Sequence, residues 1–303
     1  MIKFYLKILI ILTLLCPTFA LTCPKIGPFI DYNCDEVIKI AFTGDSITYG
    51  RGDYVNGDQG GFVRRLANQY PEETISFRNI GVPGWKSGEL LRGFKKNLNK
   101  EEFGITKRRS RDADAIIIKV GVNDWWWQKE RGVTPARVVT NIRRLVKFLR
   151  KRVPEISQTP VEPFIAVSTL IPAKRESQNA FVKEVNRLLL KYRSHKLPVY
   201  IRADTFPISL IDESTVHPTP RGYQRLARTM RKFLRRGMPA MIRKLKLRPD
   251  KDKDGVYDYF EENKFFTDPN LADTDGDGYS DMEEIFIMRT DPLDPFDPPV
   301  VIE

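Results

Sequence analysis

The sequence predicts an α/β fold, in which a mostly parallel five-stranded sheet is covered by helices on both faces and followed by a small acidic segment. From Val37 onward, short apolar runs alternate with longer stretches whose apolar residues recur at spacings of three and four, the patterns of strands and amphipathic helices. Near residue 248 the composition changes from basic to acidic. A chain of 303 residues is also longer than a typical single domain, so a main domain with an appendage is expected.

Five apolar runs bounded by Gly, Pro, Asn or Asp are the expected strands, at 37–42, 74–80, 113–120, 163–170 and 198–204. The helical patterns between and after them cover 60–70, 86–98, 134–153, 178–195 and 219–236. Strands that alternate with helices form parallel sheets with helices on both faces. Ligands of such sheets bind outside the carboxyl ends of the strands.

The first 20 residues have the features of a secretory signal peptide. Lys3 and Lys7 precede an apolar stretch from Ile8 to Leu15, and small residues precede the expected cleavage site after Ala20. The stretch is shorter than the roughly 20 residues that a bilayer span needs, although an uncleaved anchor stays an alternative. We therefore expect a protein that is secreted or located in the periplasm or cell envelope.

Cleavage after residue 20 would leave two of the three cysteines, Cys23 and Cys34. An even pair in a chain that enters an oxidising compartment predicts a Cys23–Cys34 disulfide. The expected parts are thus a signal peptide at 1–20, a main domain at 21–247 and an acidic segment at 248–303.

Charge is distributed unevenly along the chain. From Asp250 onward there are 4 basic and 17 acidic residues, whereas the preceding part has 46 and 22. The densest basic run, Arg221 to Arg248, is interpreted as a solvated helix face, a docking site for the acidic segment, or a surface attracted to an anionic envelope or lipid. A nucleic-acid partner is not expected, because the chain is predicted to be exported and shows no nucleic-acid-binding motif.

Chemically useful residues stand where three of the expected strands end. Ser46 follows the first strand in the stretch GDSITYG, Gly84 follows the second in NIGVPGW, and Asn123 follows the third in KVGVNDWWW. His217 stands far downstream in STVHPTPRGY. A hydroxyl, an imidazole and several hydrogen-bond donors are the groups that acyl transfer requires. Gly44 is expected to let the backbone turn sharply before Ser46.

At these four blocks the chain resembles the SGNH, or GDSL, hydrolase family of esterases and lipases, over about residues 37–236. The resemblance implies a three-layer, flavodoxin-like fold with Ser46 as nucleophile and His217 as base. It also implies an oxyanion hole formed by the Ser46 amide, Gly84 and Asn123. No metal is implied for catalysis. The alternative elbow G-x-S-x-G is absent from the stretch around Ser46.

The family normally carries Asp three residues before the histidine, and this chain has Ser214 there, with Asp212 and Glu213 just upstream. An acid beside the imidazole holds its productive tautomer. Three explanations stay open: Asp212 reaches the ring from a slightly longer loop, a backbone carbonyl orients a Ser-His dyad, or catalysis has been lost.

Four tryptophans are expected near this cleft. Trp125, Trp126 and Trp127 directly follow the Asn123 block, and Trp85 follows Gly84. At least one of the three successive side chains is expected to pack in the core, but all three cannot point inward, so the remainder is expected to be exposed. We expect these side chains to form a substrate wall suited to a sugar ring or an acyl chain.

The acidic segment contains an internal repeat with a 23-residue offset, DKDKDGVYDYFE at 250–261 and DTDGDGYSDMEE at 273–284. Both copies match the calcium loop pattern, with oxygen ligands at positions 1, 3, 5, 7, 9 and 12 and Gly at position 6. The expected Ca²⁺ ligands are Asp250, Asp252, Asp254, Val256, Asp258, Glu261, Asp273, Asp275, Asp277, Tyr279, Asp281 and Glu284. A disordered acidic tail is the plainer alternative.

Only 11 residues separate the two loops, too few for the flanking helices of paired EF-hands. The segment from 250 to 298 instead resembles the thrombospondin type 3 calcium-binding repeats of exported bacterial proteins. The sequence thus predicts a secreted serine esterase, acting on O-acyl carbohydrate or lipid acyl esters, with a structural calcium segment. The alternative is a noncatalytic, calcium-stabilised envelope or carbohydrate-binding protein on the same scaffold.

Overall fold

The computed structural model describes residues 25–26, 29–30, 37–53, 60–70, 75–97, 113–157, 163–213, 216–239, 241, 250–256, 258, 261–288 and 290–297. The predicted signal peptide, the Cys23–Cys34 disulfide and Ser214 lie outside these residues. They stay predictions.

The sheet has five strands, and all of them are parallel. The strands are β3 (Ile38–Gly44), β4 (Ile75–Gly81), β5 (Ala115–Lys119), β6 (Phe164–Ser168) and β7 (Val199–Ile201), in the spatial order β4-β3-β5-β6-β7. This is the doubly wound, flavodoxin-like order, which confirms the predicted fold class. A short antiparallel pair, β1 (Lys25–Ile26) and β2 (Phe29–Ile30), was not expected.

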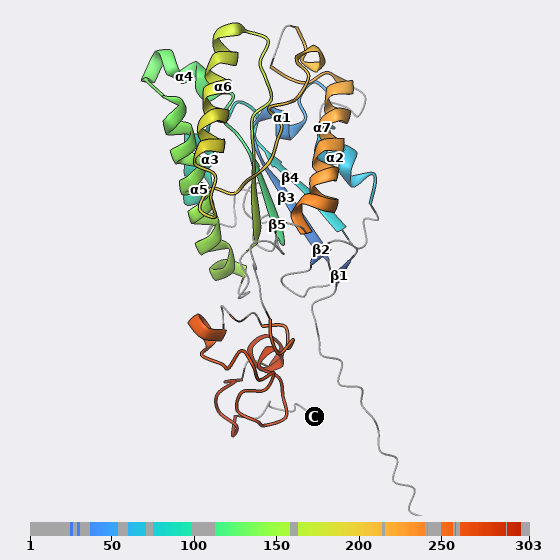
Figure 1. The fold of residues 1–303 in the computed structure, drawn as a ribbon, viewed down its shortest axis with the longest axis vertical. Coiled ribbons are helices and arrows are strands. Elements are labelled where there is room, and N and C mark those ends of the chain that lie inside the picture. Colours follow the sequence, from blue (N-terminus) through green and yellow to red (C-terminus); the bar gives the residue numbers. More distant parts are fainter. Residues whose placement is uncertain are drawn as a thin grey trace, which may run out of the picture.

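Helices cover both faces of the sheet (Figure 1). One layer contains α3 (Ser87–Asn97), α5 (Pro135–Ser157) and α6 (Glu176–Lys191), and the other contains α2 (Gly61–Ala67) and α7 (Pro220–Lys232). The remaining helices are short: α1 (Ser46–Tyr49), α4 (Asp124–Arg131) and η2 (Ile208–Leu210). After α7 the chain continues as the wider helical turns of η3 (Phe233–Gly237).

The hydrophobic core lies between the sheet and these layers. Every residue of β5 and β6 is buried, as expected for central strands with helices on both faces. The strands that were predicted from apolar runs therefore occur at nearly the predicted positions. Helices α1 and α4 are the elements around the site that the apolar pattern did not indicate.

Two glycines allow α1 to sit against the end of the sheet. Gly44 and Gly81 are register partners in β3 and β4. A Cβ on Gly44 would collide with the backbone carbonyl of Lys119, and one on Gly81 would collide with the backbone of Tyr49. Gly44 thus supplies space for close backbone approach, rather than the sharp turn expected from the sequence. Gly50, which ends α1, has a left-handed backbone with φ 101°.

We expect Gly44→Ala to destabilise the fold by about 3 kcal/mol, the upper end of the usual cost of overpacking, because the added methyl group meets rigid backbone atoms. Urea unfolding would measure this loss. Gly88→Ala in α3 is the matched control, since its Cβ would meet only side-chain atoms, at 3.4 Å or more. A Gly44→Ala protein as stable as the Gly88→Ala protein would contradict the proposed packing.

The acidic segment contains two short helical turns, η4 (Glu261–Phe265) and η5 (Glu283–Met288), each beginning within the last two positions of one of the repeat loops. In Figure 1 this segment lies beyond the lower end of the sheet, and α1 lies at the upper end. Across the described part of the chain, no helix combines the length and the apolar character needed to cross a bilayer.

Candidate active site

Ser46 begins the short helix α1 at the carboxyl end of β3. The carboxylate of Asp45 caps this helix by accepting a hydrogen bond from the Ile47 amide at 3.0 Å. The Ser46 side chain is largely buried, with 4% of its surface exposed. The sequence therefore folds locally so that a hydroxyl lies at the edge of the sheet where parallel strands present their ligands.

Asn79 fastens α1 to the neighbouring strand β4. Its amide nitrogen donates to the carbonyls of Thr48 at 2.9 Å and Tyr49 at 3.0 Å, and its oxygen accepts from the Gly81 amide. These bonds fix the position of the helix that carries Ser46. Sequence reasoning placed Asn79 inside the predicted strand 74–80 and missed this role, which depends on a contact between distant residues.

His217 reaches Ser46 from the other end of the domain sequence. Its Nε2 lies 2.8 Å from Ser46 Oγ. The chain around His217 is held by a short antiparallel pairing, in which the Asp212 amide donates to the His217 carbonyl at 2.9 Å and the Thr219 amide donates to the Leu210 carbonyl at 2.8 Å. The two residues that the sequence placed 171 positions apart are thus hydrogen-bond partners.

The imidazole of His217 has a pKa below its usual value of 6.5. Burial is the main cause and the positive charge of Arg51 adds to it, whereas the negative charge of Asp212 raises the pKa. The imidazole is therefore neutral at pH 7 and can accept a proton. Glu213, the other acid upstream, forms an ion pair with Lys174. These observations favour Asp212 as the acid that acts on His217.

The two predicted oxyanion donors lie on neighbouring loops. Asn123 precedes α4 and is 7% exposed, and its amide nitrogen donates to the Trp85 carbonyl at 3.1 Å. Gly84 directly precedes Trp85 in the loop after β4. It is exposed and has a left-handed backbone with φ 78°. A primary amide has two N–H donors, so one N–H of Asn123 is left for a ligand.

Asp124 ties the loop of Asn123 to helix α3. Its carboxylate accepts from the backbone amide of Ser87 at 2.8 Å and from the Ser87 hydroxyl at 2.7 Å. Asn141 on α5 donates to the same hydroxyl at 3.0 Å. Burial raises the pKa of Asp124 to about 6, although the Ser87 hydrogen bonds oppose the shift. This network, which sequence reasoning missed, holds the start of α4, next to Asn123, against α3 and α5.

A buried pair of opposite charges lies beneath Ser46. Asp45 and Lys119 are 0% and 1% exposed. Burial raises the pKa of Asp45 and lowers that of Lys119, and the attraction between the two groups opposes both shifts. Asp45 Oδ2 and Lys119 Nζ have no hydrogen-bond partner among the described residues. A lysine at the end of an apolar strand gave no signal of this burial.

The tryptophans form a smaller surface than predicted. Trp125 is only 6% exposed, and Trp126 is 51% exposed and packs edge-on against it at 4.7 Å between ring centroids. Trp127 is half-buried between the cations of Lys86 and Arg131. Because Trp125 belongs to the core, its place in the predicted wall is corrected.

Trp85 is also half-buried and packs against helix α3, where its ring fills the space above Gly93. The guanidinium of Arg175 lies over both Trp125 and Trp126, at 5.1 and 5.4 Å from the ring centroids. Trp126 is thus the tryptophan that presents most of its surface to a ligand.

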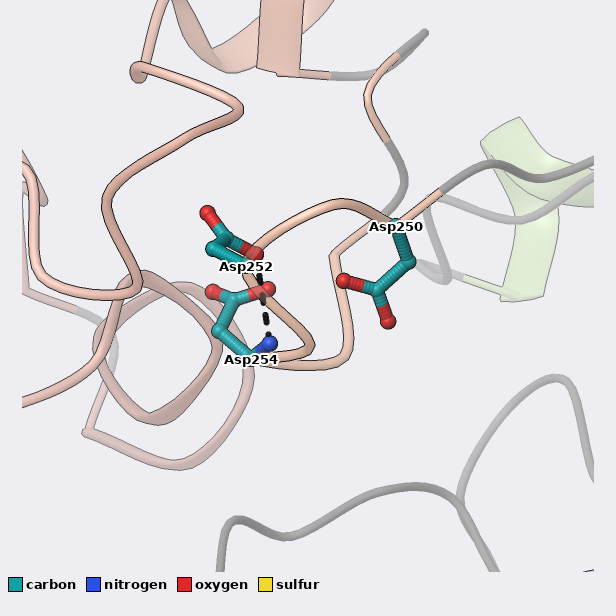
Figure 2. Close-up of side chains that lie close together, drawn as sticks. All are labelled: Asp250, Asp252 and Asp254. Carbon is teal, nitrogen blue, oxygen red and sulfur yellow. Dashed lines mark hydrogen bonds between the residues drawn. The ribbon is translucent and has the colours of Figure 1, made fainter.

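Each acidic loop gathers its first three carboxylates. Asp250, Asp252 and Asp254 come together in the first loop (Figure 2), and Asp273, Asp275 and Asp277 do so in the second. In Figure 2 the amide of Asp254 donates to Asp252, at 3.3 Å. Three carboxylates within reach of a single ion are a suitable oxygen ligand set for Ca²⁺.

The later loop positions have two different arrangements. At position 9, Asp258 accepts from the Lys251 amide and Asp281 accepts from the Thr274 amide, so both acids brace position 2 of their own loop. At position 12, one oxygen of Glu261 and one of Glu284 is buried without a hydrogen-bond partner in the described residues. The structure thus groups positions 1, 3 and 5 and leaves the complete ligand set as a prediction.

The pKa values of three of these acids are raised, to about 7 for Asp254 and Glu284 and about 8 for Glu261. Burial is the first cause in each, followed by repulsion from neighbouring carboxylates. A divalent cation would relieve both the repulsion and the missing hydrogen bonds. The residues present therefore fit a calcium ion.

Two family profiles match the chain. The GDSL-like lipase/acylhydrolase family matches residues 42–225, which is more than half of the chain, and the bacterial TSP3 repeat matches residues 273–295. Both resemblances that the sequence motifs indicated are thereby confirmed. No curated protein matches the chain at a significant level.

Several solved structures are similar in fold. A lipase from the goat rumen metagenome is 20% identical, covering 64% of this chain and 96% of its own, with a TM-score of 0.48. A lipase/acylhydrolase from Enterococcus faecalis is 23% identical, covering 65% and 96%, with a TM-score of 0.47. An acetylxylan esterase from Geobacillus stearothermophilus is 22% identical, covering 65% and 94%, with a TM-score of 0.47.

Proposed function

The chain is an ester-hydrolysing member of the GDSL-like lipase/acylhydrolase family, and on that premise we propose that it is a secreted esterase with Ser46 as its nucleophile. The observation that carries this proposal is the 2.8 Å contact between His217 Nε2 and Ser46 Oγ. The depressed pKa of His217 supports it, because a neutral imidazole is the form that accepts the serine proton.

In the proposed reaction, His217 takes the proton of Ser46 while Ser46 Oγ attacks the ester carbonyl. The resulting tetrahedral oxyanion accepts hydrogen bonds from the amides of Ser46 and Gly84 and from Asn123 Nδ2. His217 then protonates the departing alcohol, which leaves an acyl group on Ser46. A water molecule, deprotonated by His217, attacks the acyl group; His217 then returns that proton to Ser46 Oγ as the bond to the acyl group breaks, which releases the carboxylic acid and restores the free serine.

Asp212 is proposed to stabilise the imidazolium that forms in both steps. Its negative charge already raises the pKa of His217, as an acid in this role would. Asp212 stands two residues before the position at which the family normally carries its acid. The antiparallel pairing between 210–212 and 217–219 nevertheless brings the backbone of Asp212 beside that of His217, which supports this assignment.

The proposed substrates are O-acyl carbohydrates and lipid acyl esters. Trp126, half exposed and beside Arg175, offers an aromatic face on which either a sugar ring or an acyl chain can pack. The acidic segment is proposed to bind two Ca²⁺ ions in a structural role, and the predicted signal peptide supports export to the periplasm, the envelope or the medium.

Labelling with a fluorophosphonate probe tests the nucleophile. The wild-type protein should take up one probe per chain, and Ser46→Ala should take up none, because the probe reacts only with an activated serine. Ser194→Ala is the matched control, since Ser194 is an exposed serine whose bonds to Leu197 use only backbone atoms. Labelling of Ser46→Ala would reject the assignment, and an unlabelled wild type would favour the noncatalytic binding protein.

A further inference from the structure

We propose that a basic groove between β7 and α7 binds an anionic polysaccharide. The basic groove is a cavity of about 670 Å³ lined by Tyr200, Ile201, Arg202, Thr205, Arg225, Arg228, Thr229, Lys232, Phe233, Arg236 and Gly237. It is formed by the edge strand of the sheet and the last helix of the main domain. None of the residues assigned to ester hydrolysis lines it.

The sequence of α7 directs its cations toward solvent. Tyr223, Leu226 and Met230 are fully buried against the core, so the remaining face of the helix must carry the charged side chains. Arg225, Arg228 and Lys232 are exposed on that face, and Arg236 continues the row in η3. The spacing of three and four places them along one line of roughly 16 Å.

Within the part of the chain that the structure describes, these four cations have no acidic partner. None of the described residues places a carboxylate in the lining of the basic groove or forms an ion pair with Arg225, Arg228, Lys232 or Arg236. Arg202, on the opposite wall, is already paired with Asp204. The positive charges in such a row repel one another, and a bound chain of carboxylates or phosphates would relieve that repulsion.

The cationic surface continues on both sides of the helix row. A second hollow of about 260 Å³ is lined by Arg228, Arg231, Lys232, Arg235 and Arg236, and a third of about 360 Å³ includes Arg65, Arg228 and Arg231. No acidic residue is among the described residues that line either hollow. A surface of this extent suits a polymer with repeated charges better than a single small anion.

The shape and composition of the groove favour a polysaccharide over a bilayer. An interfacial helix inserts an exposed apolar face into lipid, but the apolar face of α7 is buried, and the large exposed hydrophobic residues that the structure describes lie elsewhere. The half-buried ring of Tyr200 and the hydroxyls of Thr205 and Thr229 can contact sugar rings. The choice of a polysaccharide over a nucleic acid rests on the proposed export.

Binding of fluorescein-labelled carboxymethyl dextran, followed by fluorescence anisotropy at fixed calcium, tests the proposal. The wild-type protein should bind this polymer and not neutral dextran, with an affinity that falls as salt rises. The triple variant R225E/R228E/K232E should bind about 100-fold more weakly. The matched control R143E/R144E/K147E makes the same change of charge on exposed residues of α5 and should stay within about threefold of wild type.

Equal weakening by the two triple variants would overturn the proposal, because it would show attraction to total charge alone. It would also be overturned if phosphatidylglycerol vesicles or a 20-base-pair DNA duplex bound more tightly than the dextran. Both variants should hydrolyse p-nitrophenyl acetate at the wild-type rate, which verifies their folding. Failure of the binding test therefore leaves the esterase proposal standing, and an inactive wild-type esterase leaves the groove proposal standing.

Discussion

Replacing Asp212 with alanine will lower kcat/KM for ester hydrolysis by about 10² to 10⁴, because the imidazolium formed in each step would lose its negative partner. The backbone bond between Asp212 and His217 is retained in this variant, since it uses main-chain atoms. Steady-state hydrolysis of p-nitrophenyl acetate measures the loss. Turnover within threefold of wild type would show that a backbone group orients His217 and that the enzyme operates as a Ser-His dyad.

The pH profile distinguishes this role from a general structural defect. In the wild type, kcat/KM should rise through an apparent pKa below 6.5, since the pKa of His217 is depressed. Arg51→Gln removes a positive charge and should raise the apparent pKa of this rise in kcat/KM. Asp212→Asn removes a negative charge and should lower it. Shifts in the same direction would contradict the assigned electrostatics.

Removing calcium will unfold the acidic segment while leaving hydrolysis of small esters intact. Each filled site is expected to stabilise its loop by roughly 3 kcal/mol when calcium exceeds the Kd about a hundredfold. Limited proteolysis and thermal unfolding, before and after dialysis against chelator, would measure the change. The esterase rate should persist, because the segment lies beyond the lower end of the sheet and α1 lies at the upper end (Figure 1).

The calcium dependence should itself depend on pH. Without the ion, Asp254, Glu261 and Glu284 have pKa values of about 7 to 8, above those of carboxyls in an unfolded chain. The folded segment then holds protons that the unfolded one releases, so its ion-free stability is present at low pH and is lost as pH rises toward 8. Calcium competes with these protons, so its affinity should increase from pH 6 to pH 8.

Calcium titrations at the two pH values would test this linkage. Asp254→Asn should abolish binding at the first loop, and Asp294→Asn is the matched control, because Asp294 is an exposed acid outside both loops. An affinity that does not change with pH, or a segment with the same melting temperature with and without calcium, would contradict the proposed role of the two loops.

The strands of the fold were predictable because buried parallel strands read as continuous apolar runs. The run at 113–120 contains β5 and the run at 163–170 contains β6. Helix α4 was missed because its start depends on a tertiary contact, in which Asp124 binds Ser87 on α3. Helix α1 has only four residues and is held by Asn79 from another strand. Neither contact has a periodic signal in the sequence.

The central residues of the site were predictable for a different reason. Parallel strands end at one edge of a sheet, so Ser46, Gly84 and Asn123 had to lie at the same edge once the strands were assigned, and the spatial order β4-β3-β5 makes their strands neighbours. His217 required the family motif, since no local pattern connects it to Ser46. The buried Lys119 was beyond reach, because a strand-terminal lysine is ordinarily solvated and its burial depends on packing around Asp45.

Because Asn79 holds α1 through its amide, the position of Ser46, the proposed nucleophile, is fixed by a neighbouring strand as well as by the chain around it. Engineering of substrate range can therefore treat the two sides of the cleft differently. Libraries that diversify Trp126 test the proposed substrate face, whereas Asn79, Gly81 and Gly84 are best left constant, since they hold α1 and the proposed oxyanion donor in place.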